Sequence, residues 1–279
     1  MIAIERFPAP VDTPMNHDYE IATMWVTGVL AATVVVAAIV WAVRQRSLLI
    51  PAILAGGAVC TLNEPIADAP ARIYHFGPGS HHLYTMLDRP MPVWIFFAYI
   101  LFYGALPAMI VLLLKRGASY RQVWAGIGIV FISNMLIEIP LTGPDKMYDY
   151  YGYQPFSIGN WSTMQLVNNG TAILLAAGLI ACLPQAFAGW RALLAVPLMP
   201  VAQVVGLAAG TPGYWVLNSD VNHLTMWIGV GAALVLGAFV MDQEIRVMTR
   251  GATGNVRSRV GAPTTESRHR ATLETVGAS

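Results

Sequence analysis

The sequence predicts an all-α membrane protein, a polytopic bundle of seven transmembrane helices. Of its 279 residues, 56% are hydrophobic and only 11% are charged, less than half of the roughly 25% that soluble domains carry. Long stretches contain no Asp, Glu, Lys or Arg, for example from Ile21 to Val43 and from Pro90 to Leu114. A helix needs about 20 predominantly apolar residues to cross a bilayer, so these stretches have the length of membrane spans.

Seven candidate spans follow one another along the chain. Their approximate bounds are Ile21 to Val43, Leu48 to Ala67, Pro92 to Leu114, Gln122 to Leu141, Trp161 to Leu183, Ala192 to Gly210, and Asn218 to Met241. The second span contains Glu64, the fourth contains Glu138, and the sixth contains Pro197 and Pro200. Proline is tolerated in a membrane helix whose neighbours satisfy the freed carbonyl, so we expect kinks in the sixth span rather than ends.

Basic residues predict the orientation of the bundle, because Lys and Arg concentrate in cytoplasmic loops. The loops after spans one, three and five and the segment after span seven hold Arg44, Arg46, Lys115, Arg116, Arg121, Arg191, Arg246 and Arg250. The opposite side holds Arg6, Arg72, Arg89 and Lys146. The N-terminus is therefore predicted outside and the C-terminus in the cytoplasm.

This topology divides the chain into three parts. Residues 1–20 form an extracytoplasmic segment, residues 21–242 form the seven-helix membrane domain, and residues 243–279 form a basic, disordered cytoplasmic tail. Arg is far commoner than Lys, and Ala, Val and Gly are abundant, a composition that we interpret as bacterial. The expected location is the bacterial plasma membrane. The net charge of +1 argues against a nucleic-acid binder.

Three carboxylates lie within or at the end of predicted spans, namely Glu64, Glu138 and Asp220. An ionisable residue in a membrane segment is costly, so it marks a functional site by default. We interpret Glu64 and Glu138 as catalytic, since Ser, Thr or Asn would link helices at lower cost. The alternative is that both acids only hold the bundle together. Asp220 is either an N-cap of the seventh helix, like its neighbours Asn218 and Ser219, or a catalytic acid, and one carboxylate can do both.

Polar and aromatic residues near these acids are the predicted substrate contacts. Asn134 precedes Glu138 by one helical turn, so the two share a face and Asn134 can hydrogen-bond the carboxyl group. Gln165 and Asn169 have the same spacing, which makes the outer half of the fifth helix amphipathic. The full set of predicted contacts is Asn63, Tyr99, Tyr103, Asn134, Gln165, Asn168, Asn169, His223 and Trp227.

The third span carries a group of aromatic residues. An aromatic belt at the membrane interface accounts for Trp94, Phe96 and Phe97 without any further role. Tyr99 and Tyr103 lie deeper, and their rings could stabilise a cationic ligand or intermediate if they face the bundle interior. An interfacial belt or core packing is the better explanation for the aromatic residues of this span taken together. Of these residues, only Tyr99 and Tyr103 are predicted to contact the substrate.

No metal or cofactor is predicted. His75, His81 and Asp88 could in principle bind a metal. However, histidines in loops are more often simply solvated. The sequence contains no Gly-rich phosphate loop, no CxxC, no GxSxG and no Asp-rich DDxxD pattern. The seventh span has no lysine that could hold retinal.

Buried carboxyl groups suggest an acid-catalysed reaction. An apolar environment disfavours the charged form, so a buried Glu or Asp can stay protonated and donate its proton to an epoxide or an alkene. A second, ionised carboxylate can stabilise the resulting carbocation or remove a proton at the end. A bundle that opens to lipid suits a lipophilic polyene substrate.

The seven predicted spans, the motif Asn63-Glu64-Pro65 near the outer end of the second span, and Asn218-Ser219-Asp220 at the start of the seventh resemble the small integral-membrane terpene cyclases of the pyripyropene-cyclase type. The resemblance covers about Ile21 to Met241. It implies cyclisation of an isoprenoid chain attached to another scaffold, with Glu64 and Asp220 as acid and partner. Glu138 has no counterpart in it. A neighbouring prenyltransferase and epoxidase would be the expected biosynthetic partners.

Two other functions stay open at this point. One is a sterol or isoprenoid double-bond isomerase similar to the emopamil-binding family, in which intramembrane acids and aromatic residues also handle a carbocation. The other is a proton-coupled small-molecule transporter or receptor, in which Glu64, Glu138 and Asp220 relay protons or hold a cation. The predicted partners are a lipophilic isoprenoid substrate and membrane lipid, and no nucleic acid.

Overall fold

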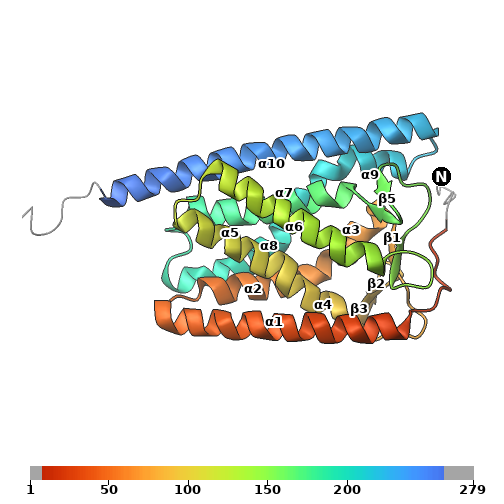
Figure 1. Cartoon of the computed structure of the whole chain (residues 1–279), viewed down its shortest axis with the longest axis horizontal. Helices are drawn as coiled ribbons and strands as arrows, with labels where there is room; N and C mark the ends of the chain where they lie inside the picture. The colour runs from red at the N-terminus through yellow and green to blue at the C-terminus, as the bar shows by residue number, and fades with distance from the viewer. Residues whose placement is uncertain (1–7, 261–279) are drawn as a thin grey trace, which may run out of the picture.

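The computed structural model describes residues 8–260 of the chain and is mostly helical (Figure 1). Within these residues, seven helices are long and apolar enough to cross a membrane. They are His17–Gln45, Leu49–Ala71, Val93–Lys115, Tyr120–Leu141, Met164–Cys182, Gly189–Leu217 and His223–Gly251. The predicted number of apolar helices is confirmed, and each observed helix overlaps its predicted range.

Four of the seven helices are continuous, namely α1 (His17–Gln45), α6 (Tyr120–Leu141), α7 (Met164–Cys182) and α10 (His223–Val260). The other three change helical type along their length. The second span consists of α2 (Leu49–Val59), the 3₁₀-helix η1 (Cys60–Asn63) and α3 (Glu64–Ala71). The third consists of α4 (Val93–Tyr99), the π-helix η2 (Ile100–Ala105) and α5 (Leu106–Lys115). The sixth consists of η3 (Gly189–Leu194), α8 (Ala195–Leu207), η4 (Ala208–Gly210) and α9 (Thr211–Leu217).

The sixth span does not end at its two prolines, as the sequence predicts. Helix α8 continues through both Pro197 and Pro200. The change to 3₁₀ geometry comes later, at Ala208–Gly210, where Thr211 Oγ1 donates a hydrogen bond to the Ala208 carbonyl (2.7 Å). The helix can continue through proline because other groups in a membrane bundle satisfy the freed carbonyls.

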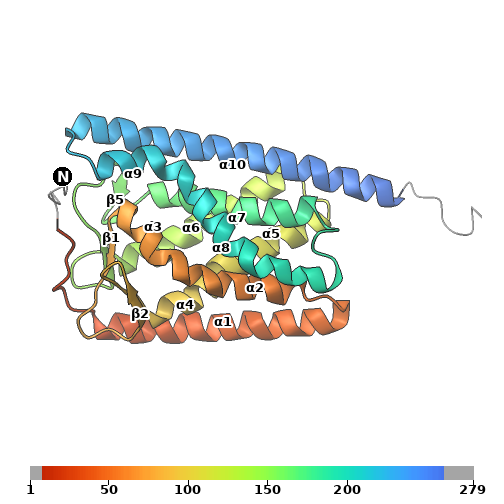
Figure 2. The ribbon, with the colours of Figure 1, turned by 180° about the vertical axis from the view of Figure 1, so that it is seen from behind.

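Short strands, six within residues 8–260, gather at one end of the bundle (Figures 1 and 2). They form three antiparallel pairs, β1 (Ile73–His75) with β4 (Tyr148–Tyr150), β2 (His82–Met86) with β3 (Arg89–Pro92), and β5 (Ser157–Ile158) with β6 (Trp161–Ser162). The prediction of a purely α-helical fold is therefore corrected to a helical bundle with a small β cap. The turn between β2 and β3 places Leu87 and Asp88 at φ 53° and 54°, as a tight two-residue hairpin of type I′ requires.

The main core lies where α2, η2, α7 and α8 meet, and it includes Ile53, Tyr103, Ile173 and Met199. The contact between α2 and η2 is backbone to backbone. A Cβ atom on Gly57 would lie 2.6 Å from the Gly104 nitrogen, so a larger residue there would separate the two segments. This contact fixes the π-helix, and with it Tyr103, against the second span.

Both terminal helices start or end at positions different from those predicted. Helix α1 begins at His17, four residues before the predicted start, because the Asn16 side chain caps it by accepting from Tyr19 N (3.4 Å). Helix α10 runs to Val260, well past the predicted end at Met241. Buried Ile245 and an ion pair between Asp242 and Arg246 (2.6 Å) continue its helical pattern. The predictions for residues 1–7 and 261–279 lie outside the described residues.

Candidate functional site

A cavity of about 330 Å³ extends from β1 and β4 at the capped end to the middle of α6. Most of its wall is apolar or aromatic, with contributions from α1, α4, η2, α5, α6 and α7. Ile129 and Ile137 line it from α6 and are 66% and 59% exposed on the bundle surface, while Met109 lines it from α5 and is 37% exposed. The cavity therefore reaches the apolar flank of the bundle beside α5 and α6.

One wall of the cavity carries a cluster of two acids and a histidine, the Glu64–Asp68–His75 cluster. Glu64 begins α3 directly after the 3₁₀ turn, and Asp68 follows one helical turn later on the same face. Arg72 then turns the chain with a left-handed backbone (φ 56°), which brings His75 on β1 back to the two acids. His75 Nε2 lies 3.7 Å from Glu64 Oε1 and 3.5 Å from Asp68 Oδ2.

This cluster is buried and poor in hydrogen bonds. The side chains of Asp68 and His75 are 1% and 3% exposed. Among the described residues, neither oxygen of Asp68 and neither ring nitrogen of His75 has a hydrogen-bond partner. Buried polar atoms are normally paired, so unpaired ones at a cavity wall point to a ligand, a proton or an ion.

A metal ion is one candidate for this position, since the donor atoms of Glu64, Asp68 and His75 all lie within 4.8 Å of one another. However, a histidine that ligates a metal almost always donates its other ring N–H to an acceptor. His75 Nδ1 has no such acceptor within residues 8–260. The geometry therefore fits proton exchange between the three side chains better than ligation of a metal.

Another part of the wall carries Glu138, near the end of α6. Its Oε2 atom accepts three hydrogen bonds, from Tyr148 Oη (3.1 Å), Tyr150 Oη (3.0 Å) and Trp161 Nε1 (2.8 Å). Burial, followed by the negative charge of Glu138, raises the pKa of Tyr148 and of Tyr150 well above its usual value. Both phenols therefore keep their protons and stay donors to the carboxylate, where they stabilise negative charge on Oε2.

The β1–β4 pair connects the two acidic walls. Its register sets His75 opposite Tyr148, and their rings lie 4.9 Å apart. Trp94 completes this aromatic group, with its ring 5.8 Å from His75 and 6.0 Å from Tyr148. Tyr148 thus touches His75 with its ring and Glu138 with its hydroxyl.

Five of the predicted substrate contacts line the cavity. The rings of Tyr99 and Tyr103 meet edge to face at 4.8 Å, and Tyr103 Oη donates to Asn169 Oδ1 (2.7 Å). Asn134 and Gln165 also face the cavity, and each has a buried side-chain nitrogen without a hydrogen-bond partner in the described part of the chain. Asn134 nevertheless interacts with the Glu138 carboxyl group one helical turn away, as the shared helical face predicts.

Two other predicted contacts link helices outside the cavity lining. Asn63 Nδ2 donates to the Pro200 carbonyl (2.9 Å) and to Gln203 Oε1 (3.0 Å), which ties the second span to the sixth. Asn168 Nδ2 donates to Tyr214 Oη (2.7 Å). Their positions indicate structural roles.

The predicted residues at the start of the seventh helix also lie outside the cavity lining. Asp220 is exposed between α9 and α10. His223 stacks on Tyr153 with ring centroids 4.1 Å apart, and Trp227 Nε1 donates to Tyr153 Oη (2.6 Å). The cap of α10 is Asn222, whose Oδ1 accepts from Thr225 N (2.9 Å), and not Asn218, Ser219 or Asp220.

Several residues that line the cavity, and Trp161, which hydrogen-bonds Glu138, are not among the site residues predicted from the sequence. Asp68 has a local signal, because it follows Glu64 by four residues on one helical face. Trp161 and Tyr150 have none, since their link to Glu138 depends on how the β cap folds over α6. The structure separates His75 from His81, two members of the possible metal site His75, His81 and Asp88. His75 belongs to the cavity, whereas His81 contacts Glu20.

The arrangement places exchangeable protons, a carboxyl group with three hydrogen-bond donors and aromatic faces around one apolar cavity. Such a set can protonate an apolar substrate, stabilise a cation and take up a proton.

The chain matches no protein-family model, no curated protein and no solved structure.

Proposed function

We propose that the protein is a membrane-bound isoprenoid cyclase that works by acid–base catalysis through a carbocation, of the same kind as the terpene cyclases that its sequence resembles. The observation that carries this proposal is that the Glu64–Asp68–His75 cluster and Glu138 face one mostly apolar, aromatic-lined cavity. Its volume of about 330 Å³ is within the range of small-molecule sites. The substrate is a lipophilic chain that carries an epoxide or an alkene.

In this mechanism the Glu64–Asp68–His75 cluster supplies the proton. The ligand atoms of the three side chains lie within 4.8 Å of one another, so one proton can pass between them. Glu64 presents it to the substrate, because its side chain is 13% exposed, against 1% for Asp68. The proton forms an O–H bond as the epoxide C–O bond breaks, or a C–H bond with an alkene, and a carbocation results.

Glu138 ends the reaction. Its carboxylate, stabilised by three donors, lies opposite a developing positive charge and removes a proton from a carbon next to the cation, which forms the new double bond. The proton then returns to the Glu64–Asp68–His75 cluster for the next turnover, and Tyr148 lies between the two sites. Product and substrate have the same mass.

The aromatic wall protects the cation between these steps. The rings of Trp94, Tyr99, Tyr103 and Tyr148 line the cavity, and aromatic faces attract cations while excluding water. The π-helix η2 places Tyr103 there, and π-helical turns frequently mark functional sites.

The proposal differs from the sequence resemblance in one assignment. Glu64 keeps its role, but Glu138 replaces Asp220 as its partner, since Asp220 is exposed outside the cavity lining. The proposal also includes the predicted topology, with the β cap on the outer side of a bacterial plasma membrane. A substrate dissolved in the bilayer enters beside α5 and α6, where the cavity reaches the apolar flank.

The test is mass spectrometry of isoprenoids from membranes that contain the wild-type protein or one of two variants. Glu64→Gln keeps the shape but removes the acid, and we expect a loss of product of at least about 100-fold. Asp220→Asn is the matched control outside the cavity lining, and its product level should stay within about twofold of wild type. Identical profiles for wild type and Glu64→Gln, with substrate in excess, would overturn the proposal.

Product structure separates the alternatives. Conversion of linear polyenes into rings supports a cyclase, whereas double-bond migration in ring-containing substrates alone would assign the emopamil-binding type of isomerase. Proton-coupled uptake of an unchanged compound into liposomes would instead assign a transporter.

A further inference from the structure

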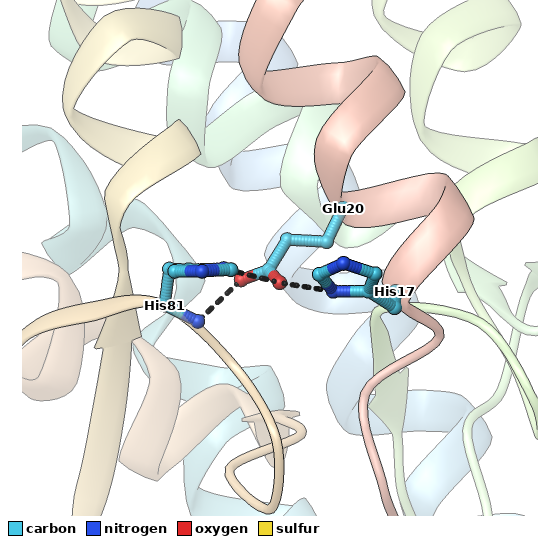
Figure 3. Close-up of side chains that lie close together, drawn as sticks. All are labelled: His17, Glu20 and His81. Carbon is cyan, nitrogen blue, oxygen red and sulfur yellow. Dashed lines mark hydrogen bonds and ion pairs between the residues drawn. The ribbon is translucent and has the colours of Figure 1, made fainter.

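A second cluster of ionisable side chains lies apart from the cavity lining, where the first turn of α1 meets the loop before β2 (Figure 3). It consists of His17 and Glu20 from α1 and His81 from the loop, and we call it the rim cluster. His17 and Glu20 are three residues apart and share one helical face. All three side chains point toward one another (Figure 3).

The donor atoms of the rim cluster have the spacing of a metal site. Glu20 Oε2 lies 3.0 Å from His81 Nδ1 and 3.8 Å from His17 Nδ1. The ligand atoms of all three residues lie within 4.8 Å of one another. Around a tetrahedral Zn²⁺ with bonds of about 2.0–2.1 Å, neighbouring ligand atoms are about 3.3–3.4 Å apart. The observed separations lie on either side of this value, so small side-chain rotations would close the site.

The environment of Glu20 is the second observation that points to a cation. Its side chain is fully buried, while the side chains of His17 and His81 are 63% and 52% exposed. Within residues 8–260, its ion-pair partners are these two histidines. A buried carboxylate requires compensation of its charge, by a paired group or by a coordinated metal ion. A divalent ion at the open side of the cluster would supply it.

The backbone already holds the three residues in place. Glu20 Oε1 accepts from the His81 backbone N–H (2.7 Å), and Met15 N donates to the Pro78 carbonyl (2.9 Å). Lys146 anchors the same turn of α1 through a hydrogen bond to Tyr19 Oη (2.6 Å). Ligands that the fold already holds in place bind a metal without a large loss of conformational entropy.

We propose that the rim cluster binds one Zn²⁺ ion, with His17, Glu20 and His81 as three ligands and water as the fourth. Two histidines and one glutamate with an open position form a known type of zinc ligand set. On binding, the proton on His81 Nδ1 that faces Glu20 leaves this nitrogen and Nε2 takes up a proton, so the ring stays neutral with Nδ1 free to bind the ion. The ion would fasten the start of α1 to the loop before β2. This site is independent of the proposed cyclase activity.

The test is metal binding by the full chain purified in detergent, measured by calorimetry with Zn²⁺ and by the visible absorption of Co²⁺. The wild type should bind one ion per chain and gain thermal stability. The double variant His17→Ala/His81→Ala should bind more than about 100-fold more weakly, since even second-shell changes cost 10–100-fold. His82→Ala removes an exposed neighbour outside the cluster and should bind like wild type.

Two further variants keep the test decisive. Glu20→Gln retains size and the hydrogen bond to His81 N, and it should also lose the ion. His75→Gln removes the histidine of the cavity and should leave Zn²⁺ binding unchanged. Absence of stoichiometric binding in the folded wild type would overturn the proposal. So would binding that survives His17→Ala/His81→Ala, including the case in which His75→Gln abolishes it.

Discussion

The cavity cluster and the rim cluster are built from the same residue types in opposite proportions. Glu64, Asp68 and His75 combine two acids with one histidine and are almost fully buried. The rim cluster combines one buried acid with two exposed histidines. An apolar cavity favours neutral, proton-sharing groups, whereas solvent access lets a hydrated ion exchange its waters for ligands. Environment, more than composition, thus assigns proton chemistry to one cluster and a metal to the other.

The two clusters are mechanically connected through the β2–β3 hairpin. His81 lies just before β2, and Tyr84 within β2 donates a hydrogen bond to the Thr61 carbonyl (2.6 Å). Burial, followed by the charges of Glu64 and Asp68, raises the pKa of Tyr84 to about 12. The phenol therefore keeps its proton and its hydrogen bond to the turn that precedes Glu64. The β2–β3 hairpin therefore links His81 of the rim cluster to the turn that precedes Glu64.

The largest expected contrast comes from the same substitution in each region. Glu138→Gln removes the negative charge opposite the carbocation, and product formation should fall at least about 100-fold. Glu20→Gln is the matched change in the rim cluster and should leave product within about twofold while abolishing Zn²⁺ binding. Product is measured by mass spectrometry, with folding checked by size-exclusion chromatography. Equal losses of product in both variants would remove the functional distinction between the clusters.

A smaller effect is expected from the support of Glu138. Trp161→Phe removes one of the three donors to Oε2, and hydrogen bonds to charged groups contribute about 1.5–3 kcal/mol. Product formation should fall about tenfold or more in the wild-type background and change little once Glu138→Gln is present, because the two residues act together. The exposed Trp190 provides the control substitution, Trp190→Phe. Fully additive losses would mean that Trp161 supports packing only.

Removal of metal should affect stability and not activity. Zn²⁺ at 100 times its Kd stabilises a folded protein by about 2.7 kcal/mol, or about 5–10 °C in Tm for a chain of this size. A chelator should therefore lower Tm of the wild type by this amount and leave His17→Ala/His81→Ala unchanged. Product formation should be the same with and without chelator. Activity that needs added Zn²⁺ would instead place a metal at Glu64, Asp68 and His75.

The seven apolar helices could be predicted because each one is a continuous run of about 20 residues, and this signal is local. The β cap could not, since its strands have two to five residues each and the β1–β4 pair joins segments far apart in the chain. The pairing of β1 with β4 brings His75 to Tyr148 across more than 70 positions. No periodic pattern in the sequence carries that information.

The candidate site shows the same division. Glu64 and Glu138 stand out from the sequence because acids in apolar runs are costly, and both line the cavity. Asp220 has the same chemical signal but lies in an exposed turn, where hydration removes the cost. Trp161 and His75 carry no intramembrane charge, so their roles depend on the folded cap. An acid within a span is therefore a stronger indicator of a site than one at its edge.

The smallest effect tests whether the β1–β4 pair is only a support for the cavity. Asp149 lies on β4 opposite Tyr74 on β1, and burial raises its pKa above the usual value. Folding therefore favours the protonated form. The pKa of Asp149 is about 4 in the unfolded chain and higher in the folded protein. The wild type therefore loses stability as the pH rises from about 4 through the folded pKa. Asp149→Asn removes this loss, so it should raise Tm by about 1–2 °C at pH 7 and by almost nothing at pH 4.

This last substitution also separates support from chemistry. His75 and Tyr148 face the cavity from the same strand pair, whereas Asp149 is not part of the cavity lining. Asp149→Asn should therefore leave product formation unchanged while Tm, measured by differential scanning fluorimetry across pH, follows the expected trend. A Tm gain that is larger at pH 4 than at pH 7 would reverse the sign and exclude burial of the charge as the cause. A loss of product would extend the catalytic wall beyond Tyr148, because the neutral Asn keeps the strand pairing that positions His75.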